Sequence, residues 1–428
     1  MSNDSPTIST NQVDAYSTVI LGAGVIGCAT AYHLSQSTDT RPDSIHLVEV
    51  SDGLFESASG KSGGFIAEDW FGPATASLGK LSFRLHQELA NQHNGGRHWG
   101  YSRSTGVSLV DGGGDLINGS QDTDWLGHGA SRAQAAQDPG IHEFESGNGP
   151  SWLKRKKGDT VDNIGEEGDV AQVDPLRLSR FLLEQCTSRG VHLHHPARAV
   201  NATTDSEAVL SGITIRHNDG TKQHIPCRRL LISAGAWTPQ VFSSLFSSSK
   251  TNIPITPYAG HSVVVRSPRW TREHETSGCH ALFTTMQSGF SPEIFSRIGE
   301  EIYVAGLNDG SIPLPDKAGN APIDQKAIEE LMVVATNLLG KDGTDVSDLE
   351  LLREGLCFRP VTRSGAPILA KVEDEVLGNI HTSQQGGVFV CAGHGPWGIS
   401  LSLGTGLVMS EMIEGKKTSA DIRRLGLR

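Results

Sequence analysis

Apolar residues at the start of the chain recur in a pattern that changes from strand to helix and back to strand. Thr18 to Leu21 form a short apolar run, glycines follow, and apolar residues then recur at helical spacing as far as Leu34. A second apolar run begins at Ser44 and ends at Glu49. This order predicts a strand–helix–strand unit within the N-terminal part of the protein.

The rest of the chain contains further helix and strand patterns. Amphipathic spacing predicts a helix that ends at Gly190 and another over 325–339, and an apolar strand from Arg228 runs into a glycine turn and a helix. Strands of a second sheet are predicted at 191–195, 198–200 and 212–217, and later strands at 261–266, 293–299 and 301–307. The segment 111–169, rich in Gly, Asp and Ser, is predicted to be dominated by loops.

The end of the chain repeats the arrangement found at its start. Residues 386–415 have the pattern of a strand, a glycine turn and a long helix. Because the same order occurs at both ends, we expect both ends to build one nucleotide-binding sheet.

The glycines of the first turn have the spacing of a dinucleotide-binding motif. Gly22 permits a tight turn, Gly24 lets the backbone approach a pyrophosphate, and Gly27 lets the helix pack closely on the strand. Glu49 ends the next strand, where a carboxylate can accept both ribose hydroxyls. FAD and NAD share this ADP half, so the unit alone does not separate them, and a glycine-rich turn without a ligand is the other interpretation.

Composition narrows the classes of protein. The 428 residues and 50 glycines suit a globular protein of two or three domains. The formal charge of −12 argues against nucleic-acid binding, and the basic run Lys154 to Lys157 is predicted to be a solvated loop. The polar first 16 residues and the lack of a long apolar run predict no membrane span, with the cytoplasm as the expected location. The six cysteines show no C-x-x-C pair, so we expect neither a disulfide framework nor a metal site.

Several motifs together resemble one family of flavoproteins. "GAGVIG", "ASGKSGG", "VDP", "ISAGAW", "FRPVTRSGAP" and "GHGPWGI" follow one another as in the D-amino-acid oxidase-like FAD-dependent oxidoreductase superfamily, which includes glycine, sarcosine and fructosyl-amine oxidases. The last motif is similar to that of a fungal subgroup of oxidoreductases. The resemblance implies FAD rather than NAD as the cofactor.

The resemblance also implies an α/β (α+β) fold of two interleaved domains. A Rossmann-like FAD-binding domain is expected to comprise 14–80, 172–255 and 353–428. A substrate domain built on an antiparallel sheet is expected to comprise 81–171 and 256–352.

Cofactor contacts are carried over from the family motif by motif. The first glycines would hold the pyrophosphate, the loop 59–64 would pass beside the pyrophosphate and the flavin ring, and 393–399 would follow the ring. The residues expected to contact FAD are Gly22, Ala23, Gly24, Val25, Ile26, Gly27, Glu49, Ser59, Gly60, Lys61, Ser62, Gly63, Gly64, Val200, Ala234, Gly235, Trp237, Cys357, Gly393, His394, Gly395, Pro396, Trp397, Gly398 and Ile399. Packing or turn roles are the alternative for the serine, lysine, histidine and tryptophans of this set.

The loop "GLCFRPVT" combines features of two branches of the family. The resemblance implies that Arg359 binds a substrate carboxylate, for which a planar guanidinium is well suited. It also implies that Cys357, followed at the family spacing by Thr362, attaches FAD through a thioether. The alternatives are a structural ion pair for Arg359 and a small packing residue beside noncovalent FAD for Cys357. Arg363 is the second candidate for the carboxylate and is expected to be exposed.

Other catalytic candidates are carried over less directly. Sarcosine oxidases use a lysine near the flavin for oxygen activation; the comparable strand here offers Tyr303, and Lys61 is a substitute. Tyr258 and His261 are expected either in the active site or in sheet packing.

These residues lead to an expected reaction. The expected activity is oxidation of the C–N bond of a small-molecule amine or amino acid to an imine by hydride transfer to flavin N5, with molecular oxygen or another electron acceptor. The alternatives are an FAD-dependent dehydrogenase of a hydroxy acid or glycerophosphate, a flavin-binding protein without catalytic activity, and an NAD-dependent dehydrogenase.

Overall fold

The computed structural model describes residues 17–112, 149–165, 168–286, 290–340 and 348–427. The helices in this part of the chain are α2 (Val25–Leu34), α3 (Ala58–Lys61), α4 (Ala76–His93), α5 (Gly95–Trp99), α7 (Pro175–Ser188), α8 (Thr238–Leu245), α9 (Arg272–Glu275), α10 (Gln325–Leu339) and α11 (Ser402–Ile413). The predicted α/β (α+β) class is confirmed, and the predicted helix at 325–339 corresponds to α10.

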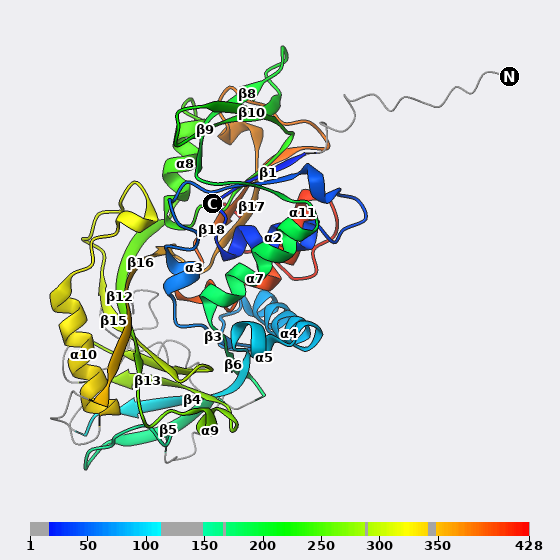
Figure 1. Ribbon diagram of the computed structural model, residues 1–428. Helices are drawn as coiled ribbons and strands as arrows, with labels where there is room; N and C mark the ends of the chain where they lie inside the picture. The colour runs from blue at the N-terminus through cyan, green and yellow to red at the C-terminus, as the bar shows by residue number, and fades with distance from the viewer. Residues whose placement is uncertain (1–16, 113–148, 166–167, 287–289, 341–347, 428) are drawn as a thin grey trace.

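A mostly parallel sheet is built from distant parts of the chain, in the upper half of Figure 1. Within the described residues it has six strands in the order β17 (Ile368–Val372), β18 (Gly387–Ala392), β11 (Arg229–Ile232), β1 (Thr18–Leu21), β2 (Ile45–Val48) and β7 (His192–His194). β1 pairs in parallel with both β2 and β11, and β11 pairs in parallel with β18. Both ends of the chain therefore contribute to one sheet, as the sequence predicts.

Alternation along β1 explains why both faces of this sheet are covered. Ile20 lies in the core shared with α2, α7 and α11, whereas Val19 and Leu21 lie in a second core on the other face. That second face is covered by α8 and by an antiparallel sheet of β8 (Ala197–Thr204), β9 (Leu210–His217) and β10 (Lys222–Pro226). A sheet buried on both faces needs continuously apolar strands, which is the pattern of this run.

A larger, mainly antiparallel sheet extends to the lower left of Figure 1. Its strands are β16 (Glu350–Val361), β12 (Thr256–Arg266), β15 (Glu301–Asp309), β14 (Glu293–Arg297), β13 (Cys279–Thr285), β4 (Ser102–Val110), β6 (Val170–Gln172) and β3 (Phe65–Ala67), with β5 (Thr160–Gly165) beside β4. α10 packs on one face through Leu331 and Leu338, while the opposite face carries Tyr303 and Phe295.

Three details of the sequence prediction need correction. The stretch 191–195 contributes β7 to the parallel sheet rather than to a second sheet, because α7 packs on α2 and the chain after α7 reaches the free edge of β2. Within 111–169, residues 160–165 form a strand that pairs with β4; residues 113–148 and 166–167 lie outside the described residues. Residues 355–361 belong to strand β16 rather than to a loop.

The predicted domain boundaries stay a prediction. The described strands of the six-stranded sheet all fall within the ranges predicted for the FAD-binding domain. β16, however, is hydrogen-bonded to β12 of the large sheet although most of it lies within the predicted range 353–428. The residues near Arg359 are therefore positioned by the large sheet.

Candidate active site

A cavity of about 550 Å³ lies at the carboxyl ends of the parallel strands. Residues that follow four of these strands line it, with Gly22 after β1, Glu49 after β2, Ser233 after β11 and Ala392 at the end of β18. The large sheet supplies the opposite wall through β14, β15 and β16. Ligands of open parallel sheets bind at this edge, so the cavity is the candidate active site.

The glycine turn has the geometry that close approach of a ligand requires. Gly22 adopts φ of +105°, and its N–H donates to the carbonyl of Val48 at 2.8 Å. A Cβ on Gly27 would overlap the carbonyl oxygen of Gly22. Gly24 precedes α2, lines the cavity and has no side chain to cap the helix, although the N–H of Val25 donates to Oγ of Ser59 at 2.9 Å. The first turn of α2, at Gly24, Val25 and Ile26, thus faces the cavity, where the helix dipole favours an anionic group.

Glu49 is held rigidly at one end of the cavity. Its two carboxylate oxygens accept hydrogen bonds from the N–H groups of Ala23 at 3.1 Å and Ser51 at 2.9 Å. Val200 lines the same cavity. This arrangement fits the ribose and adenine contacts that the sequence predicts.

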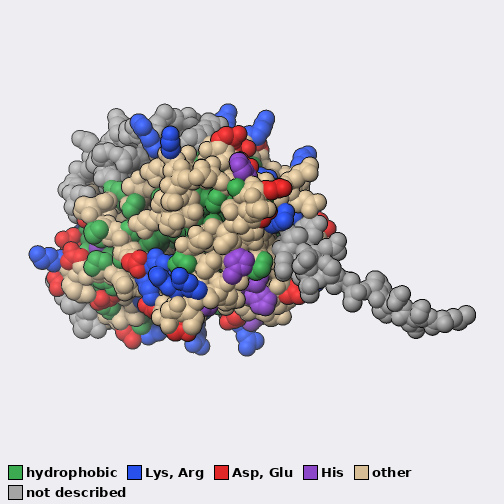
Figure 2. Space-filling view, turned by 90° about the horizontal axis from the view of Figure 1, so that it is seen from above, with side chains coloured by type: hydrophobic (Ala, Val, Ile, Leu, Met, Phe, Trp, Pro, Cys, Tyr) green, Lys and Arg blue, Asp and Glu red, His purple; other side chains and the backbone are tan. Residues whose placement is uncertain are grey.

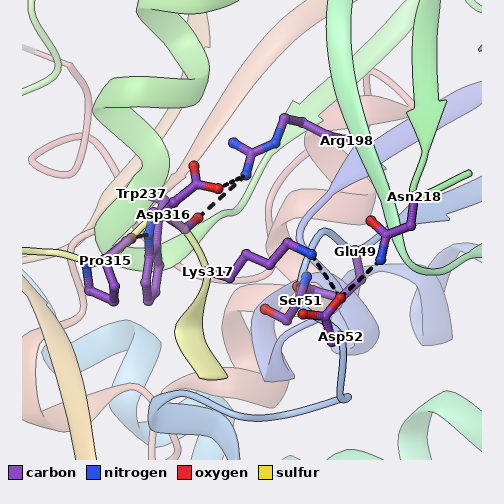
Figure 3. A network of polar contacts seen from close by, with 9 residues as sticks. All are labelled: Glu49, Ser51, Asp52, Arg198, Asn218, Trp237, Pro315, Asp316 and Lys317. Atoms are coloured by element: carbon purple, nitrogen blue, oxygen red, sulfur yellow. Dashed lines mark hydrogen bonds and ion pairs between the residues drawn. The ribbon is translucent and has the colours of Figure 1, made fainter. Parts of the chain in front are cut away.

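A segment from the large sheet reaches the Glu49 end of the cavity, as Figure 3 shows. Trp237 donates through Nε1 to the carbonyl of Pro315 at 2.7 Å. Asp316 forms an ion pair with Arg198 at 2.8 Å, and Lys317 forms one with Asp52 at 2.7 Å. Asp316 and Arg198 also line the cavity. These contacts join the two halves of the molecule beside the predicted nucleotide site.

Part of the loop after α3, residues 62–64, lines the cavity. Ser62 lines it, and the buried Oγ of this serine has no hydrogen-bond partner among the described residues, which leaves it available for a ligand. Lys61 does not line the cavity. Its Nζ donates to the carbonyl of Leu356 at 3.3 Å, and burial lowers the pKa of its ammonium group.

Cys357 and Tyr303 lie in the wall formed by the large sheet. Burial raises the pKa of the Cys357 thiol, although Arg359 and Lys61 act in the opposite direction. Tyr303 is stacked on Phe295 with ring centroids 5.9 Å apart. Burial raises the pKa of Tyr303 to about 12, so its hydroxyl keeps its proton at neutral pH.

Arg359 directs its guanidinium along the same wall. Its Nη1 donates to Oδ1 of Asn308 at 2.6 Å, and no carboxylate of a described residue lies within 4.0 Å of its nitrogens. A Cβ on Gly260 would overlap Nη1 of Arg359, so this glycine provides the space for the guanidinium. Tyr258 faces Arg359 across β12 and β16 but does not line the cavity. The exposed Arg363 does not line it either.

The turn after β18 follows the cavity from the other side. His394 lines it and shares a hydrogen bond of 3.2 Å with Oγ1 of Thr405; burial lowers the pKa of His394 to about 3. Trp397 does not line the cavity and packs against Phe71 with ring centroids 4.9 Å apart. A packing role is thus supported for Trp397.

Most of the predicted residues converge on this one cavity. Those that line it are Gly22, Gly24, Val25, Ile26, Glu49, Ser59, Ser62, Gly63, Gly64, Val200, Ala234, Gly235, Trp237, Tyr303, Cys357, Arg359, His394, Gly395, Pro396, Gly398 and Ile399. Those that do not are Ala23, Gly27, Gly60, Lys61, Tyr258, Gly393 and Trp397.

Sequence analysis missed several lining residues, among them Glu293, Phe295, Arg198, Asp316 and Cys391. Cys391 had a local signal, because it lies near the end of a strand, two residues before Gly393 of the glycine turn. The others are ordinary strand or loop residues whose place depends on the pairing of distant strands. His261, in contrast, is turned away from the cavity, and its Nε2 accepts from the N–H of Asp324 before α10.

The face seen in Figure 2 exposes several histidine side chains. Among the described residues, histidines also stack on one another along β2 and β7. His46 stacks on His192 and on His194, with ring centroids 4.9 and 5.3 Å apart. Across the described ranges, no three His, Cys, Asp or Glu side chains are arranged to hold a metal ion. In the same part of the chain, no helix is both long and apolar enough to cross a membrane.

The parallel sheet, its glycine turn and Glu49 are those of a dinucleotide-binding protein. The sequence matches the family described as "FAD dependent oxidoreductase" over residues 17–412. The chain therefore belongs to this family. The unpaired Ser62 hydroxyl, the space left by the glycines and the position of Glu49 all fit FAD.

Two fungal proteins are similar over nearly the whole chain. "Putative oxidoreductase C1F5.03c" of Schizosaccharomyces pombe is 27% identical over 94% of this chain and 96% of its own length. "Putative oxidoreductase TDA3" of Saccharomyces cerevisiae is 23% identical over 95% and 93%, respectively.

Solved structures share the fold. Glycine oxidase from Geobacillus kaustophilus superposes with a TM-score of 0.70 at 20% identity, covering 97% of this chain and 98% of that one. NikD, an amino acid oxidase of nikkomycin biosynthesis, superposes with a TM-score of 0.69 at 15% identity, covering 97% and 98%. The two-sheet architecture is thus that of the family.

Proposed function

We propose that this FAD-dependent oxidoreductase oxidises the C–N bond of a small amine or amino acid that carries a carboxylate, with molecular oxygen as the electron acceptor. The observation that carries the proposal is the position of Arg359, whose guanidinium lines the cavity that also contains the nucleotide-binding glycines. The solved amino acid oxidases with the same fold agree with this substrate class.

The surroundings of Arg359 favour binding of an anion. Its partner in the wall, Asn308, is neutral, so the charge of the guanidinium is not balanced by a carboxylate within the described part of the site. A half-buried guanidinium can donate two parallel hydrogen bonds to a carboxylate, which are among the stronger polar contacts in proteins. Because β16 is paired along its length with β12, the side chain is anchored on a rigid element.

The remaining wall is suited to orienting the reacting carbon. Phe295 and Tyr303 form a buried aromatic surface, which excludes water and leaves the Tyr303 hydroxyl as a neutral donor. When bound, FAD supplies the acceptor for the hydride that leaves the substrate carbon. If the substrate amine binds as its free base, placement by Arg359 and the aromatic wall is the main task of the protein.

The proposal is tested with Arg359→Met and, as matched control, Arg363→Met, four residues away and exposed. Anaerobic reduction of the bound flavin is followed with amino acids and with the amines that lack their carboxylates. We expect Arg359→Met to lower kcat/KM for the amino acid, because the bound carboxylate loses its charged partner. The loss should correspond to about 2–5 kcal/mol of transition-state stabilisation, with flavin content retained.

The control and the amines without carboxylates should be affected little. An equal loss with both kinds of substrate, or no loss in Arg359→Met, would contradict the role of Arg359. Reduction by hydroxy acids but by no amine would replace the proposed reaction with that of a hydroxy-acid dehydrogenase.

A further inference from the structure

Arg297 is a buried cation behind the cavity wall that the family motifs do not include. It lies on β14 and is 1% exposed. Its Nη2 donates to the carbonyls of Ser62 at 2.5 Å and Gly63 at 2.7 Å, and its Nε donates to Gly63 at 3.0 Å. All of these hydrogen bonds end on two consecutive peptide groups of the loop that lines the cavity.

The charge of Arg297 is not neutralised by an ion pair. No carboxylate of a described residue lies within 4.0 Å of it, and its Nη1 has no partner there. The guanidinium carbon Cζ of Arg297 lies over the ring of Tyr303, 4.7 Å from the ring centroid. An unpaired buried cation costs several kcal/mol in desolvation, so the two carbonyls and the ring compensate it only in part. Asp174 and Glu301 act on this charge only from beyond ion-pair distance, so part of the positive charge acts on the neighbouring cavity.

The direction of the carbonyls fixes the direction of the adjacent N–H groups. In a trans peptide the C=O and the N–H point to opposite sides. Because the carbonyls of Ser62 and Gly63 point to Arg297, the N–H groups of Gly63 and Gly64 point away from it, and both glycines line the cavity. Neither N–H is hydrogen-bonded to another described residue. Gln172 supports the same orientation by donating to the carbonyl of Gly63 at 2.6 Å.

We propose that Arg297 is a positioning residue for the cofactor. Its side chain holds the N–H groups of Gly63 and Gly64 toward the flavin and places a positive charge behind them. A hydride that leaves the substrate carbon carries two electrons and one proton, so the substrate becomes more positive by one charge and the ring more negative by one. Preoriented N–H dipoles and a fixed cation stabilise that new negative charge without reorganisation. The reduced cofactor is therefore bound more tightly than the oxidised one, whatever the substrate is.

The test is the midpoint potential of the bound flavin, measured on the purified holoprotein by dye-coupled reduction. Arg297→Gln removes the charge, Arg297→Lys keeps a cation, and Arg272→Gln is the matched control, because that arginine side chain is 86% exposed. We expect Arg297→Gln to reduce the preference for reduced over oxidised FAD about tenfold, which is a potential about 30 mV more negative. The control should have the potential of the parent protein.

Arg297→Lys keeps the proposal testable if the glutamine variant does not fold. Burial lowers the pKa of a lysine, whereas arginine keeps its proton. The midpoint potential of Arg297→Lys should therefore match that of the parent near pH 6 and become more negative than that of the parent as the lysine loses its proton at higher pH. A lysine variant whose potential is already about 30 mV below that of the parent near pH 6, where both carry the charge, would overturn the proposal. So would a folded Arg297→Gln with the parent potential, or an equal shift in Arg272→Gln.

Discussion

Replacing Gly260 by alanine should weaken binding of carboxylates without removing the cofactor. The new methyl group would occupy the position of Nη1 of Arg359, and it would lie 2.9 Å from Oδ1 of Asn308. The guanidinium is the far end of a flexible side chain, so it rather than the sheet is expected to move. Gly260 does not line the cavity, and the turn at Gly22 is not affected.

The size of the effect follows from the contacts that move. Displacement breaks the charged hydrogen bond from Arg359 to Asn308, and hydrogen bonds to charged groups contribute about 1.5–3 kcal/mol. Misplacement of a positioning group by about 1 Å can lower the rate by about 100-fold. We therefore expect the affinity for carboxylates, and kcat/KM for carboxylated substrates, to fall by about 10- to 100-fold.

A binding assay does not require the natural substrate. Acetate and benzoate are titrated into the holoprotein while the visible spectrum of the flavin is recorded, with a neutral amide of benzoate for comparison. The parent should bind the carboxylates and Gly260→Ala should bind them weakly, at equal flavin content. If the variant binds carboxylates as the parent does, or if both proteins bind the neutral amide equally well, Gly260 does not create space for a carboxylate-binding guanidinium.

Three further expectations concern the cofactor and pH. Gly24→Val should lower the flavin-to-protein ratio, since a Cβ there already lies 3.0 Å from Oγ of Ser59 and the branches would enter the cavity; Gly72→Val, in open space, is the control, and equal ratios would refute the role of Gly24. If Cys357 bears FAD, acid precipitation leaves the colour in the pellet and adds the flavin mass to its peptide; a yellow supernatant with an unmodified peptide excludes the bond. Burial lowers the pKa of His86 to about 4 and of His394 to about 3, so below their unfolded value of 6.5 the unfolded chain binds more protons than the folded one. The free energy of unfolding therefore decreases as the pH is lowered, by up to about 1.4 kcal/mol per pH unit for each histidine. Tm should thus be lower at pH 5 than at pH 7, and an unchanged Tm would contradict this.

Local patterns were sufficient to predict the nucleotide-binding part of the protein. The apolar run at Thr18–Leu21, the glycine spacing and the position of Glu49 specify strand, turn and helix within about 35 residues, because each depends on neighbours in sequence. The strand, turn and helix at the C-terminus gave the second part of the same sheet for the same reason. Covalent attachment through Cys357 and the domain boundaries remain predictions.

Tertiary structure decided the opposite wall and the direction of its side chains. The strand containing Arg359 resembled a loop in sequence, and only its pairing with β12 brings the guanidinium over Gly260. Arg297 had no sequence signal at all, since its partners lie 234 and 235 positions away. Patterns of apolar residues report which face of an element is buried, whereas the partner of a buried polar group depends on which distant strands pair. For that reason the sequence alone indicated the cofactor, and the packing of the two sheets determined what surrounds it.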